Sequence, residues 1–308
     1  MVKIVLNTLL GIVVIFIWSR VVNLEEIFQT LLKVNLLNLV PVFIFLFLSS
    51  FLRSLRLRIF LSEIKKIPLK DLFFLTGASQ MLNFFIPIRA GEIAKGVYLN
   101  TKYGLPLGKS IIWIFLDRFV DFLVGLLFAG VLLLVVPTAL SITFITIIII
   151  ILISALLIII FARKIVKFLR PLLIENHIKL YFDRLTAFIL DSFSILDRHP
   201  KDLFLMVVIT ILAYGADAAI WYFSFAALSL PQSFMKMYLG QLLSALTYLI
   251  PAAPGYIGSA EASGLLILSG VFGLETSLAS AMIVLFHILS AVFILIFGLI
   301  SIFSLKMD

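Results

Sequence analysis

Two groups of charged side chains interrupt long apolar stretches of the chain, and their types are those that bind anions. The groups are Arg89, Glu92 and Lys95, followed by Asp117, Arg118 and Asp121. A charge at the centre of a bilayer costs about 2.5–3.5 kcal/mol on the insertion scale, so these charges must pair or face an aqueous cavity. Arginine can hold a phosphate through two parallel hydrogen bonds, so a cavity lined by these residues predicts an anionic substrate.

The same residues also fit a structural ion-pair cluster near the cytoplasmic interface. Asp117 and Asp121 lie four residues apart and therefore share one face of a helix. Arg89 or Arg118 would then form ion pairs with these two carboxylates. In a third interpretation the two carboxylates bind a divalent cation, but such a site usually has more than two carboxylate ligands.

Three more ionisable residues lie within apolar stretches, namely Asp217, Glu261 and His287. Asp217 and His287 each fall near the middle of a predicted span, where a pairing between them would suit a proton-coupled step. An unpaired carboxylate at that depth would be costly or would stay protonated. A lone histidine in a membrane is more often a packing group, so a structural role for His287 stays open. Glu261 is the stronger candidate, because it occupies a position like that of Glu92.

Two breaks rich in proline and glycine organise these residues. The break residues are Pro87 and Gly91 in the first, and Pro251, Pro254, Gly255 and Gly258 in the second. Proline removes a backbone donor and glycine weakens a helix, so a helix should end at each break. A glutamate follows each break, Glu92 in the first and Glu261 in the second. We therefore predict two re-entrant broken hairpins, residues 72–98 and 234–272, with a site between them.

The composition indicates an all-α polytopic membrane protein. The 308 residues are 63% hydrophobic and 13% charged, whereas soluble domains contain roughly 45–50% and 25%. This excludes a soluble enzyme, a disordered chain and a nucleic-acid-binding module. The absence of cysteine excludes disulfides and thiolate metal sites. Six segments are long and apolar enough to span a bilayer: roughly Ile4–Ser19, Leu36–Leu52, Ser110–Val136, Ile142–Ala162, Leu203–Leu228 and Ser277–Leu305.

Lysine and arginine concentrate after the second and fourth predicted spans, which predicts that these stretches and both termini are cytoplasmic. The first hairpin should then enter from the cytoplasm and the second from outside, as an inverted repeat. The first span is interpreted as a retained signal anchor. An apolar stripe over Leu180–Leu196 predicts an amphipathic helix on the cytoplasmic face, or a connector between the repeats.

The predicted organisation is one integral membrane domain over residues 1–308. Its parts are an N-terminal anchor and loop (1–35), a first repeat (36–137), a linking span with the amphipathic helix (138–202) and a second repeat (203–308).

Three segments, Ile86–Lys95, Leu116–Asp121 and Pro254–Glu261, resemble in order the motifs of the transmembrane region of lysylphosphatidylglycerol synthases and their stand-alone flippase-like relatives. The resemblance covers roughly residues 5–305 and implies a membrane region that moves a lipid between leaflets. The motif positions are Arg89, Glu92, Asp117, Arg118, Asp121 and Glu261. Lys95 stands where arginine is more often expected, which weakens a bidentate role there. The chain stops at Asp308 without an aminoacyl-transferase domain, so no synthase activity is expected.

The leading expectation is a lipid translocase of the cell membrane, and not an enzyme, whose partner is a membrane lipid. No Gly-x4-Gly-Lys-[Ser/Thr] loop is present, so movement would be facilitated or driven by an ion gradient. No cofactor, metal or nucleic acid is expected, and the oligomeric state stays open. The alternatives are a secondary transporter of small solutes or ions and, more weakly, a membrane enzyme that acts on a lipid phosphate.

Overall fold

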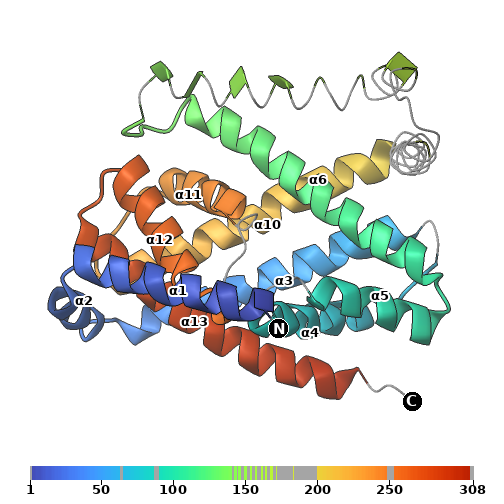
Figure 1. The fold of residues 1–308 in the computed structure, drawn as a ribbon, viewed down its shortest axis with the longest axis horizontal. Coiled ribbons are helices and arrows are strands. Elements are labelled where there is room, and N and C mark those ends of the chain that lie inside the picture. The colour runs from blue at the N-terminus through green and yellow to red at the C-terminus, as the bar shows by residue number, and fades with distance from the viewer. Residues whose placement is uncertain are drawn as a thin grey trace. The chain divides into compact units, whose positions relative to one another are not determined.

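The computed structural model describes residues 2–62, 65–86, 90–140, 200–247 and 253–305, together with isolated positions between 142 and 183. The chain divides into two compact units. The first unit joins Met1–Ala139 to Val208–Asp308, and the second unit is Leu140–Val207. All the elements described are helical (Figure 1).

Among the described residues, three elements are long and apolar enough to cross a membrane. The first is α3 (Leu39–Ser62) with the preceding turn η1 (Leu36–Asn38), and the others are α10 (Pro200–Ala227) and α13 (Thr276–Ser304). A fourth candidate combines Thr8–Val21 of α1 (Val2–Val21) with α2 (Leu24–Leu31), and the two helices bend by 88° at the break between them. Asn23 caps α2 by accepting a hydrogen bond from the Glu26 backbone N–H. The predicted first span is therefore a helix that turns sharply at its end.

The predicted third span corresponds to α6 (Leu107–Leu133), a single helix of 27 residues. Its length suffices for a crossing, but three charged residues, Asp117, Arg118 and Asp121, lie within one stretch of it. The predicted span Ile142–Ala162 and the amphipathic Leu180–Leu196 lie largely outside the described residues.

The predicted end of the second span was wrong. We placed it at Leu52 and assigned the arginines that follow to a cytoplasmic loop, whereas α3 continues to Ser62. Arginine and leucine are good helix formers, so nothing local ends the helix at Leu52. Arg53 and Arg56 consequently lie inside α3.

The first predicted break separates two helices, α4 (Leu69–Phe85) and α5 (Ala90–Tyr103). They form an antiparallel hairpin. At its tip the Asn83 side chain accepts a hydrogen bond from the Gly91 N–H at 2.8 Å, and at its open end the Tyr103 hydroxyl donates to Asp71. A Cβ on Gly91 would lie 2.1 Å from the Ser79 carbonyl oxygen, so glycine permits this close approach. Pro87 and Arg89 lie outside the described residues.

The second break also separates helices. α11 (Phe234–Thr247) precedes it, and the turn η3 (Pro254–Tyr256), α12 (Ser259–Leu265) and the π-helical turn η4 (Leu266–Val271) follow. Gly255 and Gly258 have φ angles of 71° and 83°, which favour glycine. Pro251 lies outside the described residues. The predicted interruption of the chain in this region is thus confirmed.

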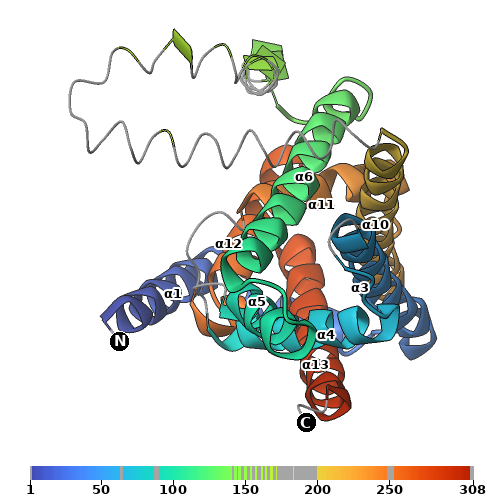
Figure 2. The same ribbon diagram turned by 90° about the vertical axis from the view of Figure 1, so that its right-hand side faces the viewer.

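The tips of the two hairpins meet. The ring of Phe84, at the end of α4, lies 6.1 Å from the ring of Tyr256 in η3, centroid to centroid. Each hairpin also packs on the long helix of the other half, α4 along α13 and α11 along α6 (Figure 2). The second arm of each hairpin packs on the helix that follows it, α5 on α6 and α12 on α13. Both halves of the chain therefore use the same packing scheme.

Candidate functional site

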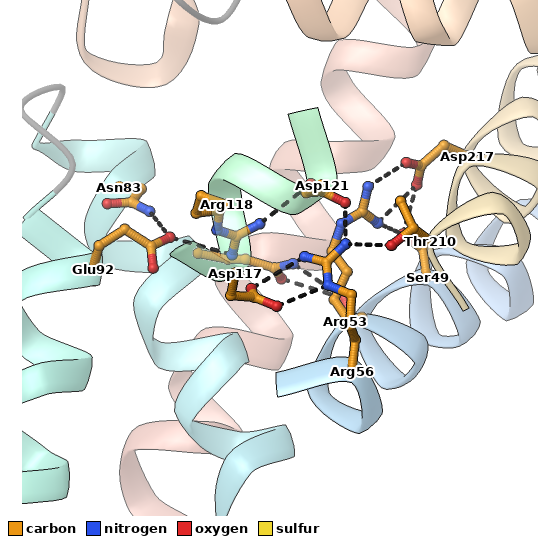
Figure 3. Close-up of polar contacts among 12 residues, drawn as sticks. Ser49, Arg53, Arg56, Asn83, Glu92, Asp117, Arg118, Asp121, Thr210 and Asp217 are labelled. Atoms are coloured by element: carbon orange, nitrogen blue, oxygen red, sulfur yellow. Dashed lines mark hydrogen bonds and ion pairs between the residues drawn. The ribbon is translucent and has the colours of Figure 1, made fainter. Parts of the chain in front are cut away.

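Helix α3 carries a polar stripe through an otherwise apolar segment. Ser49, Arg53 and Arg56 are spaced by four and three residues, so they share one face of the helix. This face meets α6 and α10, which bring carboxylates to it (Figure 3). The cluster built on this stripe is called the charge network below.

Arg56 forms the core of the charge network. Its side chain is 1% exposed. Its Nε and Nη2 atoms donate to the two carboxylate oxygens of Asp117 at 2.8 and 3.1 Å, an arrangement of two parallel bonds. Its Nη1 donates to Asp121 and, at 3.0 Å, to the Thr210 hydroxyl. One arginine thus bonds both predicted carboxylates of α6.

Glu92, at the start of α5, joins the first hairpin to α6. One carboxylate oxygen lies 3.1 Å from Lys95 Nζ and the other lies 3.3 Å from Arg118 Nη2. Arg118 also approaches Asp121, at 3.8 Å. The predicted pairing of Arg118 with a carboxylate of its own helix is therefore present, but its shorter contact is with Glu92.

Arg53 and Asp217 complete the charge network. Arg53 Nη2 lies 2.6 Å from Asp217 Oδ2, and the Ser49 hydroxyl donates to Asp217 Oδ1 at 2.6 Å. We had considered Asp217 as a partner of His287. That pairing was wrong, because Asp217 is bonded to an arginine on α3, whereas His287 is bonded elsewhere.

Among the described residues, the charge network balances four cations, Arg53, Arg56, Lys95 and Arg118, against four carboxylates, Glu92, Asp117, Asp121 and Asp217. Its interior is sealed: Lys95 is 3% exposed and Arg56 only 1%. Its rim is open, since the Arg118 side chain is 28% exposed and that of Arg53 is 16% exposed. Arg118 is therefore the most exposed of the four cations.

A second polar cluster lies at the second break. His287 Nδ1 of α13 lies 2.5 Å from Glu261 Oε1 of α12, and His287 Nε2 lies 2.7 Å from the Gly255 carbonyl oxygen. The other oxygen of Glu261 accepts the Gly258 N–H at 2.7 Å. Glu261 thus pairs with a basic residue 26 positions later, and the same separation relates Glu92 to Arg118.

Sequence reasoning found most of the charge network but not its central residue. Arg53 and Arg56 were counted as loop charges, although their spacing from Ser49 already indicated a shared helical face. Glu92, Lys95, Asp117, Arg118 and Asp121 come together as expected, whereas Arg89 lies outside the described residues. Glu261 and His287 also come together, but at a separate cluster.

The long apolar helices, the two broken hairpins and the buried charges define an integral membrane protein with a polar site inside its helical bundle. The model of the family described as lysylphosphatidylglycerol synthase TM region matches residues 4–298, and the chain belongs to this family. The resemblance seen in the three sequence motifs is thereby confirmed, and it associates the chain with a function that concerns membrane lipids. A comparison with curated proteins gave no match.

Proposed function

We propose that this protein is a lipid translocase. It moves an anionic or aminoacylated phospholipid, or a polyprenyl-phosphate-linked lipid, between the leaflets of the cell membrane. The observation that carries the proposal is a buried ionic core whose most exposed cation, Arg118, lies at its rim, in a chain of a lipid-associated membrane family. The headgroup crosses along this polar rim while the acyl or prenyl tails stay in the bilayer.

Arg118 is the proposed headgroup ligand. Its contacts to carboxylates, 3.3 and 3.8 Å, are longer than the 2.8 Å contact that fixes Arg56. A phosphate can therefore draw the Arg118 guanidinium away from Glu92 at modest cost. Lys95 stays on Glu92 at 3.1 Å and keeps that carboxylate paired when Arg118 turns to the ligand.

The proposed membrane architecture has six spans and two re-entrant hairpins in an inverted repeat. Three features support it: the meeting of the hairpin tips at Phe84 and Tyr256, the reciprocal packing of α4 on α13 and of α11 on α6, and the equal spacing of the two glutamate–base pairs. Inverted repeats place a transport site where the broken helices meet. Cytoplasmic termini remain part of the proposal, supported by the distribution of lysine and arginine.

The proposal treats the chain as a transporter and not as an enzyme. A lipid-phosphate enzyme would use Asp117 and Asp121 to hold a divalent cation, but Arg56 is bonded to both carboxylates. Recruiting a cation there would expel a buried guanidinium from its partners, which is costly.

Arg118→Ala tests the proposal in vesicles that contain fluorescently labelled phosphatidylglycerol, with transfer followed by quenching of the outer leaflet. A charge-assisted hydrogen bond contributes about 1.5–3 kcal/mol, so transfer should fall about tenfold or more. Arg58→Ala, which alters an exposed arginine of α3, is the control and should transfer at the wild-type rate.

Equal transfer by well-folded Arg118→Ala protein and wild type would remove Arg118 from the pathway. Uptake of free glycerol phosphate into wild-type vesicles that move no labelled lipid would instead favour a transporter of small anionic solutes.

A further inference from the structure

The contacts of His287 at the second break show where protons must lie. A carbonyl oxygen only accepts hydrogen bonds, so the contact of 2.7 Å to Gly255 requires a proton on His287 Nε2. The contact of 2.5 Å between His287 Nδ1 and Glu261 Oε1 also requires a proton, because both atoms would otherwise be acceptors. This second proton lies between α12 and α13, on the imidazole or on the carboxyl group.

The proton between Nδ1 and Oε1 links the second break to α13. With it, His287 holds Glu261 through one ring nitrogen and the Gly255 carbonyl through the other. Without it, a lone pair and a carboxylate face each other at 2.5 Å and repel, so the imidazole or the break must move. The imidazole is 17% exposed, so the pair is not fully enclosed by the described residues.

Other charged groups on the neighbouring elements are held by partners of their own or are exposed. Arg53 and Arg56 of α3 bind Asp217, Asp117 and Asp121, and Asp71 of α4 binds Tyr103 and Lys102. Arg58 of α3 and Glu25 and Glu26 of α2 are exposed. Arg20 of α1 and Lys70 of α4 are exposed as well, and Lys236 of α11 and Tyr256 of η3 are partly exposed. Tyr238 of α11 donates to the Ile211 carbonyl oxygen, and Glu275 caps α13.

We propose, on the basis of the translocase function above, that Glu261 and His287 form the proton-binding site that drives lipid movement. In this step the proton between His287 Nδ1 and Glu261 Oε1 leaves the pair and passes to water. The pair then changes from net neutral to net negative, with a neutral imidazole that keeps its Nε2 proton and a glutamate carboxylate. The connection between α13 and the second break is released, and rebinding of a proton restores it.

Asp217 does not compete for this role. Its two oxygens already receive hydrogen bonds from Arg53 and Ser49, and neither of these partners is a histidine. Glu261 instead shares its proton with histidine, the side chain that titrates nearest to neutral pH.

The first experiment measures the proton directly and needs no lipid transfer. The chain contains three histidines, so His177→Asn and His199→Asn together leave His287 as the only imidazole signal in nitrogen NMR of the whole protein in nanodiscs. Wild-type His287 should show a proton on Nε2 and a second, shared proton on Nδ1 that is lost in one step as the pH rises. An Nδ1 signal of an unprotonated nitrogen from pH 5 to pH 9 would overturn the proposal.

Glu261→Gln is the matched variant. Its amide oxygen can still accept the Gly258 N–H, and its NH2 group can donate to His287 Nδ1, so the connection persists without a releasable proton. The titration step of His287 should therefore disappear. Glu25→Gln, the same change on exposed α2, should leave the step in place.

The second experiment couples the proton to flux in vesicles with labelled phosphatidylglycerol and an imposed pH gradient. One proton per lipid allows about a tenfold ratio between leaflets for each pH unit, since one unit corresponds to about 1.4 kcal/mol. Wild type should reach an unequal distribution of lipid between the leaflets, whereas Glu261→Gln should not respond to the gradient.

If wild type instead distributes the lipid equally between the leaflets under a gradient, proton coupling is overturned and the translocase function stands. No wild-type transfer at all would overturn the translocase, and the NMR titration would still decide the proton site.

Discussion

The two breaks have the same construction but different basic partners. In both, the helix that restarts carries a glutamate, and that glutamate bonds a base on the next long helix 26 residues later. The first break has Arg118, which keeps its charge at any physiological pH, and its glutamate belongs to a network of eight charged groups among the described residues. The second break has His287, bonded to Glu261 and to a backbone carbonyl.

The difference suggests a division of labour within the repeat. A permanent guanidinium is suited to attract a phosphate, whereas an imidazole is suited to gain and lose a proton near neutral pH. The meeting of Phe84 with Tyr256 puts the two breaks in contact, so a movement at one can reach the other. Changing the partners at each break tests whether the division is real.

The largest effect is expected from Arg56→Met, which removes the core of the charge network. Asp117 and Asp121 would lose their buried partner, and breaking such a pair costs about 3–5 kcal/mol because a charge is left uncompensated. The free energy of unfolding in detergent should therefore fall by that amount, or the protein should fail to fold. His287→Gln, at the second break, should cost less because it leaves only one carboxylate without its partner. An equal loss in both variants would contradict the contrast between the two breaks.

Arg118→His should give the first break the pH dependence that we assign to the second. Histidine ordinarily titrates near pH 6.5, so its charge is present below about that value and lost above it. Transfer of labelled phosphatidylglycerol should therefore be retained at pH 5.5 and fall several-fold by pH 8. Arg118→Lys keeps the charge and is the control, with a lower rate but no such fall. A flat pH profile for Arg118→His would show that the charge at this position does not act on the lipid.

Local chemistry explains what the sequence could predict. The end of α4 at Phe85 and the start of α5 at Ala90 follow from Pro87 and Gly91, whose effects on the backbone need no distant partner. The polar cluster of Asp117, Arg118 and Asp121 was likewise visible, because charges are conspicuous in an apolar helix.

Partners that lie far apart in the sequence explain what it could not. Arg56 enters a membrane helix only because Asp117 and Asp121, 61 and 65 residues away, neutralise it. Asp217 is 164 residues from Arg53, so a single sequence offers no means to choose Arg53 over His287 as its partner. The π-helical turn after α12 has no local signal that we can identify.

The smallest effect is expected at the open end of the first hairpin, where Asp71 bonds Tyr103 and Lys102. Burial alone would raise the pKa of Asp71, but the hydrogen bonds from Tyr103 and Lys102 and the charge of Lys102 outweigh it and lower the pKa below 3.8. A carboxylate with a depressed pKa stabilises the fold above its unfolded-state pKa, and this contribution is lost as the pH falls through the folded-state value. Asp71→Asn should therefore unfold more easily than wild type at pH 7, and the gap should close below about pH 4.

The open end of the second hairpin gives the matched comparison for Asp71. There Glu275 caps α13 through the N–H groups of Ser277 and Leu278, at 2.8 and 3.1 Å, and the Ser277 bond is the main cause of its lowered pKa. Glu275→Gln should show the same sign of pH dependence, because its carboxylate is also stabilised in the folded protein. Thermal unfolding of both variants from pH 7 down to pH 3 measures the two gaps. If the gap between Asp71→Asn and wild type stays constant across this range, Asp71 contributes through packing rather than through its charge. The charged residues that stabilise the first hairpin would then be those of the charge network alone.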